Sequence, residues 1–311
     1  MKLFWILLGL CSALALLALL ISYICFRMAF YSPKRKHSDS IDAILPPSET
    51  YAPYRQQMRE LTLQTRQIPY SPAEITSFDG LKLYGKYYEC DPSAPMEIMF
   101  PGYRGLAERD LCGGVQRAFA VGRNVLLVDQ RACGTCEGNI ITFGIYERLD
   151  CLAWIRYAIE RFGPDVKIVL SGVSMGAATV TMAAGLDELP SNVFGVVADS
   201  GYSSPKDIIC KVIGDMHLPP QLGWPFVKLG AKLFGKFDIE AASSMEAVQK
   251  AKVPIYFAHG EADDFVPCHM TQQLYGACVS EKTLVLIPNA GHGLCYLVAP
   301  DTYIETLKNA F

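Results

Sequence analysis

Hydrophobic and polar positions follow one pattern at the start of the chain and another in the rest of it. The apolar run from Phe4 to Phe26 spans 23 residues, has only three positions that are not apolar and contains no charged residue. Such a run is long enough to cross the roughly 30 Å hydrocarbon core of a bilayer as a helix. The pattern therefore predicts a single transmembrane anchor within residues 1–30.

A cleaved signal peptide is the alternative interpretation of this run. The apolar stretch of a signal peptide is about 7–15 residues long, and small residues mark the cleavage site that follows it. Here the run is longer, and its end, Ile24-Cys25-Phe26-Arg27, offers no such residues. We therefore expect the helix to be retained.

The charges beside the run predict which side of the membrane the rest of the chain occupies. Only Lys2 precedes the run, whereas Arg27, Lys34, Arg35 and Lys36 follow it. The positive-inside rule assigns the more basic flank to the cytoplasm. Nine scattered cysteines lie beyond the run, an odd number that is typical of reduced thiols rather than of a disulfide framework. Both signals favour a cytoplasmic domain on a membrane anchor.

Residues 31–73 have the composition of a polar linker punctuated by prolines. Within this linker, side chains that can form one face of a helix recur at helical spacing: Tyr54, Met58, Leu61, Thr65 and Ile68. We expect a short amphipathic helix there, packed on a main domain that occupies residues 74–311.

From residue 74 onwards, short apolar runs alternate with helical stretches. Glu74–Phe78 and Leu81–Glu89 flank the dipeptide Asp79-Gly80, a strong hairpin signal. Six further strand-like runs follow: Glu97–Phe100, Asn124–Asp129, Val166–Ser171, Val193–Asp199, Pro254–Ala258 and Thr283–Ile287. Several are continuously apolar, as parallel strands covered on both faces are. The sequence predicts an α/β fold with a mostly parallel central sheet and helices on both faces.

One connection is much longer than the others. About fifty residues separate Ser200 from Val253, and apolar side chains within them keep helical spacing at Phe226, Leu229 and Leu233. A long insertion in a compact domain is usually a lid or a binding element. We expect a helical lid at about residues 202–250, with a purely structural helical extension as the alternative.

The clearest chemical signal is Gly172-Val173-Ser174-Met175-Gly176, which follows a buried strand and leads into an apolar helical stretch. Small residues two positions before and after the serine allow the backbone to fold back on itself. Such a turn raises the hydroxyl above the sheet, beside a helix N-terminus that can stabilise an oxyanion. Ser174 is therefore the candidate nucleophile.

A nucleophilic serine needs a base and an acid that orients the base. His292 follows the last strand, and Asp263 and Asp264 follow the preceding one, so all candidates lie at carboxyl ends of strands. Spacing alone does not choose between the two aspartates. A metal site formed by these aspartates with His259 and His269 is the alternative, but the set lacks a recognisable ligand spacing.

These motifs together resemble the α/β-hydrolase superfamily of serine hydrolases, over about residues 75–311. The segments His259-Gly260-x-x-Asp263-x-x-Val266-Pro267 and Ala290-Gly291-His292 resemble most the branch of small bacterial esterases and acyl-peptidase-like domains. In that branch the acid is the aspartate four residues after the histidine. The resemblance implies a Ser174–Asp263–His292 triad with Asp264 in reserve, and it implies a structural role for His259.

The resemblance also implies an oxyanion hole made by the backbone N–H groups of Tyr103 and Met175. Tyr103 lies in the turn Phe100-Pro101-Gly102-Tyr103-Arg104-Gly105, where Pro101 replaces the usual histidine. Because the donor is a backbone group, we expect the hole to survive this replacement.

A second departure lies at Asp129-Gln130-Arg131-Ala132-Cys133-Gly134-Thr135-Cys136. Proteins that this chain resembles tend to carry Asp-x-Arg followed by histidine, glycine and serine at this place. The Cys-x-x-Cys spacing suggests redox chemistry, but no thioredoxin-like pattern surrounds it. We expect Cys133 and Cys136 to be packing thiols, and Asp129 and Arg131 to be structural.

Composition narrows the function further. The net charge of −3, with 19% charged residues, excludes a strongly basic nucleic-acid-binding protein and wholesale disorder. We expect a membrane-anchored hydrolase of carboxylic esters or thioesters that acts on a small or lipid-like acyl substrate and needs no cofactor and no metal. The alternatives are an acyl-peptide hydrolase or aminopeptidase-like enzyme, and a non-catalytic binding protein on the same scaffold.

Overall fold

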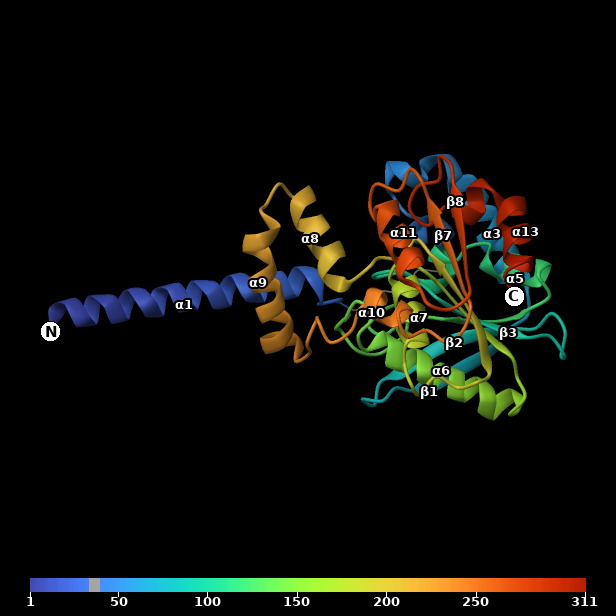
Figure 1. Cartoon of the computed structure of the whole chain (residues 1–311), viewed down its shortest axis with the longest axis horizontal. Coiled ribbons are helices and arrows are strands. Elements are labelled where there is room, and N and C mark those ends of the chain that lie inside the picture. The colour runs from blue at the N-terminus through green and yellow to red at the C-terminus, as the bar shows by residue number, and fades with distance from the viewer. Residues whose placement is uncertain (34–39) are drawn as a thin grey trace.

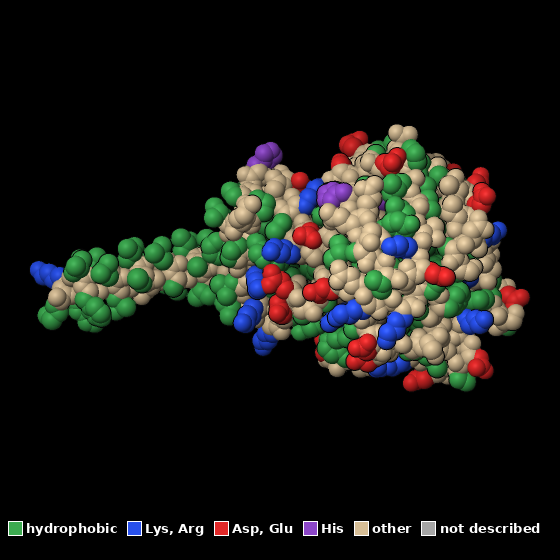
Figure 2. All heavy atoms as spheres, in the orientation of Figure 1, with side chains coloured by type: hydrophobic (Ala, Val, Ile, Leu, Met, Phe, Trp, Pro, Cys, Tyr) green, Lys and Arg blue, Asp and Glu red, His purple; other side chains and the backbone are tan. Residues whose placement is uncertain are grey.

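A computed structural model describes residues 1–33 and 40–311, which form one long N-terminal helix and an α/β body (Figure 1). Helix α1 (Lys2–Ala29) projects away from the body for most of its length, and Figure 2 shows it covered with hydrophobic side chains. Among the described residues it is the one helix long and apolar enough to cross a membrane. The basic residues Lys34, Arg35 and Lys36, which partly determine the predicted orientation, lie outside the described residues.

The body is built around an eight-stranded sheet with the strand order β1-β2-β4-β3-β5-β6-β7-β8. Its strands are β1 (Ser71–Thr76), β2 (Lys82–Tyr88), β3 (Met96–Phe100), β4 (Asn124–Val128), β5 (Ile168–Val173), β6 (Val193–Asp199), β7 (Ile255–Gly260) and β8 (Lys282–Ile287). Strand β2 is antiparallel to β1 and β4, and the other neighbours are parallel. The predicted hairpin and mostly parallel sheet are confirmed.

Helices cover both faces of this sheet, as the sequence predicts. They are α4 (Ala107–Asp110), α5 (Gly114–Ala120), α6 (Glu147–Phe162), α7 (Met175–Ala184), α11 (Cys268–Ala277), α12 (Cys295–Val298) and α13 (Pro300–Lys308). Alternate residues of β5 show the division, since Leu170 packs with α6 and α7 whereas Val169 packs with α13. Every residue of β3, β4 and β5 is buried, which explains their continuous apolar runs.

The predicted linker helix is present and packs on the body. The segment forms α2 (Ile41–Ile44), a 3₁₀ helix η1 (Glu49–Tyr54) and α3 (Arg55–Gln67). Met58 and Thr62 of α3 are buried, and the Gln116 side chain donates to the Leu61 carbonyl at 3.1 Å. The segment therefore covers part of the body, and β1 begins at Ser71, three residues before the predicted domain boundary at residue 74.

The insertion is helical, as predicted, and one of its helices crosses the inner end of α1 (Figure 1). Its elements are α8 (Pro205–Asp215), α9 (Pro220–Gly230), the π-helical turn η2 (Ala231–Gly235) and α10 (Ser244–Val248). Helix α9 crosses α1 so closely that a Cβ at Gly230 would overlap the Ser22 carbonyl oxygen. Phe26 and Phe30 are buried in the same apolar cluster as Phe237. The last third of α1 is thus part of the body.

Candidate active site

Ser174 lies between β5 and α7, at the sharp turn that the sequence predicts. Its backbone has φ 57° and ψ −117°, a conformation that non-glycine residues rarely adopt. A Cβ at Gly172 would overlap the backbone of Gly176, and one at Gly176 would overlap the Phe100 carbonyl. The two glycines therefore permit the fold-back that presents Ser174, and the strain is typical of functional sites.

His292 and Asp263 are joined by a hydrogen bond. His292 Nδ1 lies 2.7 Å from Asp263 Oδ2, and the other carboxylate oxygen accepts from the backbone N–H groups of Phe265 and Val266 at 3.0 and 2.8 Å. Asp264, the other aspartate that the sequence left open, is exposed. The structure therefore pairs His292 with Asp263, the aspartate that the family resemblance selects.

His259 also contacts the Asp263 carboxylate. Its Nε2 lies 2.8 Å from the Val266 carbonyl oxygen and 3.1 Å from Asp263 Oδ2, so this nitrogen carries a hydrogen, and Nδ1 lies 2.6 Å from the Thr271 hydroxyl. Both ring nitrogens are thus engaged in a structural role, which argues against the metal alternative. Among the described residues, no group of three or more His, Cys, Asp or Glu side chains is arranged to hold a metal ion.

Asp263 is 7% exposed, and its charge depends on these two histidines. Burial alone would raise the pKa of the carboxyl group, but the hydrogen bonds from His259 and His292 outweigh burial and hold its pKa well below the usual value. Asp263 is therefore a carboxylate at neutral pH and can accept the Nδ1 hydrogen of His292.

Ser174 and His292 line one cavity of about 500 Å³. Within residues 1–33 and 40–311 no hydrogen bond joins the Ser174 hydroxyl to the His292 ring. Unliganded sites commonly hold this contact long and tighten it when a substrate binds. The hydroxyl of Tyr51 donates to the His292 backbone carbonyl at 3.1 Å, so η1 helps to hold the loop that carries the histidine.

The turn after β3 lies directly against Ser174. A Cβ at Gly102 would come within 3.4 Å of the Ser174 Cβ. The turn is fixed on two sides, because the Gly102 N–H donates to Asp110 Oδ2 at 3.0 Å and the Gln130 amide donates to the Pro101 carbonyl at 2.6 Å. Tyr103 follows Gly102 in this turn and, like Ser174, lines the cavity.

Met175 is the first residue of α7, directly after Ser174. The backbone N–H groups of the first helical turn have no partners within their own helix and suit the binding of an anion. Tyr103 and Met175 therefore lie on the two segments that flank Ser174, as expected of the two donors of an oxyanion hole.

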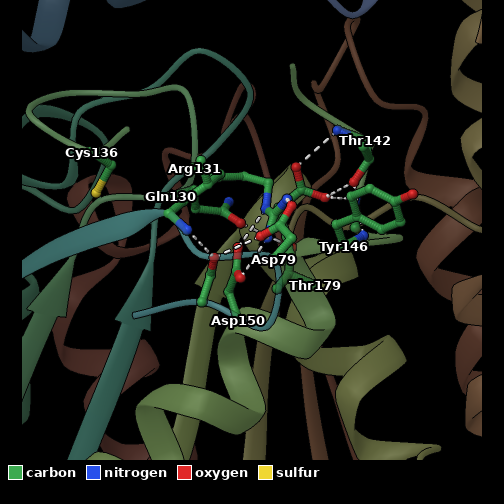
Figure 3. Close-up of polar contacts among 12 residues, drawn as sticks. Asp79, Gln130, Arg131, Cys136, Thr142, Tyr146, Asp150 and Thr179 are labelled. Atoms are coloured by element: carbon green, nitrogen blue, oxygen red, sulfur yellow. Dashed lines mark hydrogen bonds and ion pairs between the residues drawn. The ribbon is translucent and has the colours of Figure 1, made fainter. Parts of the chain in front are cut away.

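The Asp-Gln-Arg segment after β4 forms a structural cluster (Figure 3). The Arg131 guanidinium donates to Asp79 at 2.9 and 3.1 Å and to Asp150 at 2.6 and 2.7 Å. It also lies close to the rings of both Phe78 and Tyr146, at 5.1 and 5.2 Å from their centroids. Burial raises the pKa of Asp150 to about 6, although the hydrogen bonds and charge of Arg131 lower it. Arg131 thus ties the β1–β2 hairpin to α6, which agrees with the expected structural role.

Cys133 and Cys136 are both buried, and neither is in a disulfide. Burial raises the pKa of each thiol well above its ordinary value, so both are protonated at neutral pH. The Cys136 sulfur accepts from the Tyr84 N–H at 3.2 Å and donates to the Asp129 carbonyl at 3.2 Å. These contacts are those of packing thiols, and they do not support the redox alternative.

No family profile matches the sequence, but several proteins are similar to it. The uncharacterized protein YqkD of Bacillus subtilis is 26% identical over 192 residues, which are 60% of this chain and 62% of that protein. The protein bem46 of Schizosaccharomyces pombe is 26% identical over 165 residues, 52% of this chain and 49% of that protein. The match thus spans 49% to 62% of the length of these relatives.

Solved structures give the fold. The Pyrococcus furiosus esterase Pf2001 is 22% identical, with a TM-score of 0.66 over 90% of this chain and 96% of that one. The protein Est1E from Butyrivibrio proteoclasticus is 19% identical, with a TM-score of 0.57 over 76% of this chain and 96% of that one. The protein described here therefore has the α/β-hydrolase fold and is similar in structure to esterases of that fold.

Proposed function

We propose that the protein is a serine hydrolase that cleaves a carboxylic ester or thioester through an acyl-enzyme intermediate. The observation that carries this proposal is the hydrogen-bonded Asp263–His292 pair, whose histidine lines the same cavity as a serine on a strained strand-to-helix turn. The structural similarity to the esterase Pf2001 supports the same reaction class.

The chemistry follows from the protonation states. Because the Asp263 carboxylate accepts the Nδ1 hydrogen of His292, the Nε2 lone pair of the ring is available as a base. As the Ser174 oxygen bonds to the substrate carbonyl carbon, its proton passes to Nε2, and the carbonyl oxygen becomes an oxyanion held by the N–H groups of Tyr103 and Met175. Collapse expels the alcohol or thiol, which takes the proton from His292.

Deacylation repeats these steps with water. His292 removes a proton from a water molecule as the water oxygen attacks the acyl carbon, and the proton then returns to Ser174 as the acid departs. Ser174 and His292 are thus the groups of the chain that exchange protons in this cycle, with the leaving group and the water molecule as their partners.

The acyl group would occupy the cavity beside Ser174. Among its lining residues are Met58, Leu111, Leu294 and Leu297, which give one end an apolar surface. Its described lining comes from the linker segment and the body, and none of it from the insertion at 202–250. The insertion remains a predicted lid, but the linker segment is the part of the chain that covers this cavity, so we assign acyl selection to it.

Met58 offers a test of acyl selection. Met58→Trp should fill the apolar end, and we expect kcat/KM for p-nitrophenyl octanoate relative to the acetate to fall about 10-fold or more, since each methylene in an apolar pocket contributes about 1–3 kcal/mol. Leu63→Trp is the control, because Leu63 lies on the exposed face of α3, 41% exposed. An unchanged octanoate-to-acetate ratio would rule out this acyl site.

We also propose that α1 is a membrane anchor that is retained in the mature protein. Residues 3–21 are almost entirely exposed and apolar, about 30 Å of helix at 1.5 Å per residue. Ser22, Phe26 and Phe30 are instead buried in the body. Removal of α1 as a signal peptide would take Tyr23 and Phe26 away from Phe234, which packs on both rings, and this contact supports retention.

Activity-based labelling tests the proposed function directly. We expect a fluorophosphonate probe to label the folded full-length protein at Ser174, and we expect turnover of esters or thioesters in a panel that also contains aminoacyl amides. Preferred cleavage of the amides would favour the peptidase alternative. Absence of both labelling and turnover would favour the non-catalytic binding protein.

A further inference from the structure

The inner end of α1 lies against the turn after β3. Helix α1 ends at Ala29, and the chain continues along the body, where the Ser32 N–H donates to the Asn139 carbonyl at 2.8 Å and the Ile141 N–H donates to the Phe30 carbonyl at 2.8 Å. The last carbonyl groups of a helix have no partners within their own helix and carry its partial negative charge. A helix end buried in this way needs donors from elsewhere in the chain.

Tyr103 and Arg104 supply those donors. The Tyr103 hydroxyl donates to the carbonyl oxygens of Ala29 at 2.8 Å and Met28 at 3.3 Å. The Arg104 guanidinium donates to the carbonyl oxygens of Met28 at 3.0 Å and Tyr31 at 2.6 Å. A cation is favourable at the carboxyl end of a helix, so the contact is electrostatic as well as a set of hydrogen bonds.

The same two residues belong to the turn that contacts Ser174. Arg104 has φ 51°, a left-handed conformation that is costly for a side chain of this size, so surrounding contacts must hold it. The Tyr103 ring packs on Phe143 at a centroid distance of 5.1 Å, and Phe143 packs in turn on Phe30, the residue that follows α1. Polar and aromatic contacts thus both join α1 to this turn.

We infer that the carboxyl end of α1 positions the turn at residues 101–104, which we call the oxyanion turn, so that α1 contributes to catalysis as well as anchoring the protein. Gln130 and Asp110 hold the turn at Pro101 and Gly102, whereas α1 holds it at Tyr103 and Arg104. Without α1 the backbone N–H of Tyr103 would lose its fixed direction toward the oxyanion. The inference rests on the proposed function, and it makes the side chains of Tyr103 and Arg104 positioning groups.

Two substitutions in the full-length protein, purified in nanodiscs, test the inference. Tyr103→Phe removes the hydroxyl that contacts α1, and Arg104→Met removes the guanidinium at similar length, while both leave the backbone N–H in place. We expect kcat for an ester substrate to fall about 10- to 100-fold with KM within about 3-fold, since small displacements of catalytic groups cost up to about 10²-fold. Arg104→Lys should restore part of the loss.

A trifluoromethyl ketone separates positioning from general stability. Ser174 adds to its carbonyl carbon, the proton moves to His292, and the resulting oxyanion occupies the same hole as in the reaction. The inhibition constant should therefore rise by the same factor as kcat/KM falls across the variants. Lys232→Met is the control, since Lys232 is an exposed basic residue of η2, which packs on α1 away from this turn. We expect it to retain wild-type kcat and inhibition.

The outcomes distinguish the inference from the function on which it rests. Variants with wild-type kcat and ketone affinity would overturn the inference, whether or not their melting temperature falls, because the contacts would then serve stability alone. A wild-type protein that neither turns over esters nor binds the ketone would overturn the proposed function and the inference with it.

Discussion

Ser174→Ala is expected to abolish ester hydrolysis, with kcat falling about 10⁶-fold toward the uncatalysed background. The hydroxyl is the one group on the strained turn that can form the acyl-enzyme, and a neighbouring water cannot take its place without losing that intermediate. Alanine can occupy the same backbone conformation as serine, and Ser174 makes no side-chain hydrogen bond with other described residues. The melting temperature should therefore stay close to that of the wild type.

The measurement is steady-state hydrolysis together with fluorophosphonate labelling of the same preparations. Ser191→Ala, which alters an exposed serine in the loop before β6, should keep full activity and labelling. If Ser174→Ala retained more than about one hundredth of the wild-type kcat, another nucleophile would have to carry the reaction, and the proposed mechanism would be wrong.

Asp263→Asn should reduce kcat by about 10⁴-fold while leaving the geometry of the site largely intact. An amide can donate to Nδ1 of His292, which places the ring hydrogen on Nε2 and leaves no base facing Ser174. Asp264→Asn is the control, because the neighbouring carboxylate is exposed, and it should change kcat by no more than about 3-fold. Equal losses from the two substitutions would contradict the choice of Asp263.

The pH dependence of the same variant follows from the depressed pKa of Asp263. A carboxyl group whose pKa is lower in the folded state stabilises that state fully above its unfolded pKa, near 3.9, and loses this contribution as the pH falls toward the folded value. The difference in unfolding free energy between wild type and Asp263→Asn should therefore be constant from about pH 5 to 8 and shrink in acid. Denaturant titrations of both proteins from acid to about pH 8 measure this difference in unfolding free energy.

The sheet could be predicted from the sequence because its signals are local. Strands covered on both faces must be apolar at consecutive positions, and the Asp79-Gly80 hairpin has its own turn chemistry. The sharp turn at Ser174 could be predicted for the same reason, since only glycines, which lack a Cβ, permit it at positions 172 and 176. His292 and Asp263 follow successive strands of a parallel sheet, and such strand ends meet at one edge.

The remainder of the site depends on contacts between distant segments, which leave no local signature. Tyr51 touches the His292 loop across more than two hundred residues, and nothing in its own segment indicates a partner. Asp110 and Gln130 hold the oxyanion turn through single hydrogen bonds to backbone groups, and other polar residues of similar reach can form such bonds equally well. The linker segment over the cavity and the burial of the inner end of α1 follow from packing that only the folded chain defines.

The close crossing of α1 and α9 at Gly230 has a consequence for where the proposed enzyme can act. A domain joined to a membrane by a flexible linker samples a wide volume around its attachment point. Its local concentration at the membrane surface falls as the linker lengthens. Here the inner end of α1, at Ser22 and Phe26, is packed inside the domain that α1 would anchor. With the proposed anchor in a bilayer, Ser174 would therefore keep a fixed height and tilt relative to the membrane. The proposed enzyme would then act in a thin layer along the membrane and not in the surrounding solution.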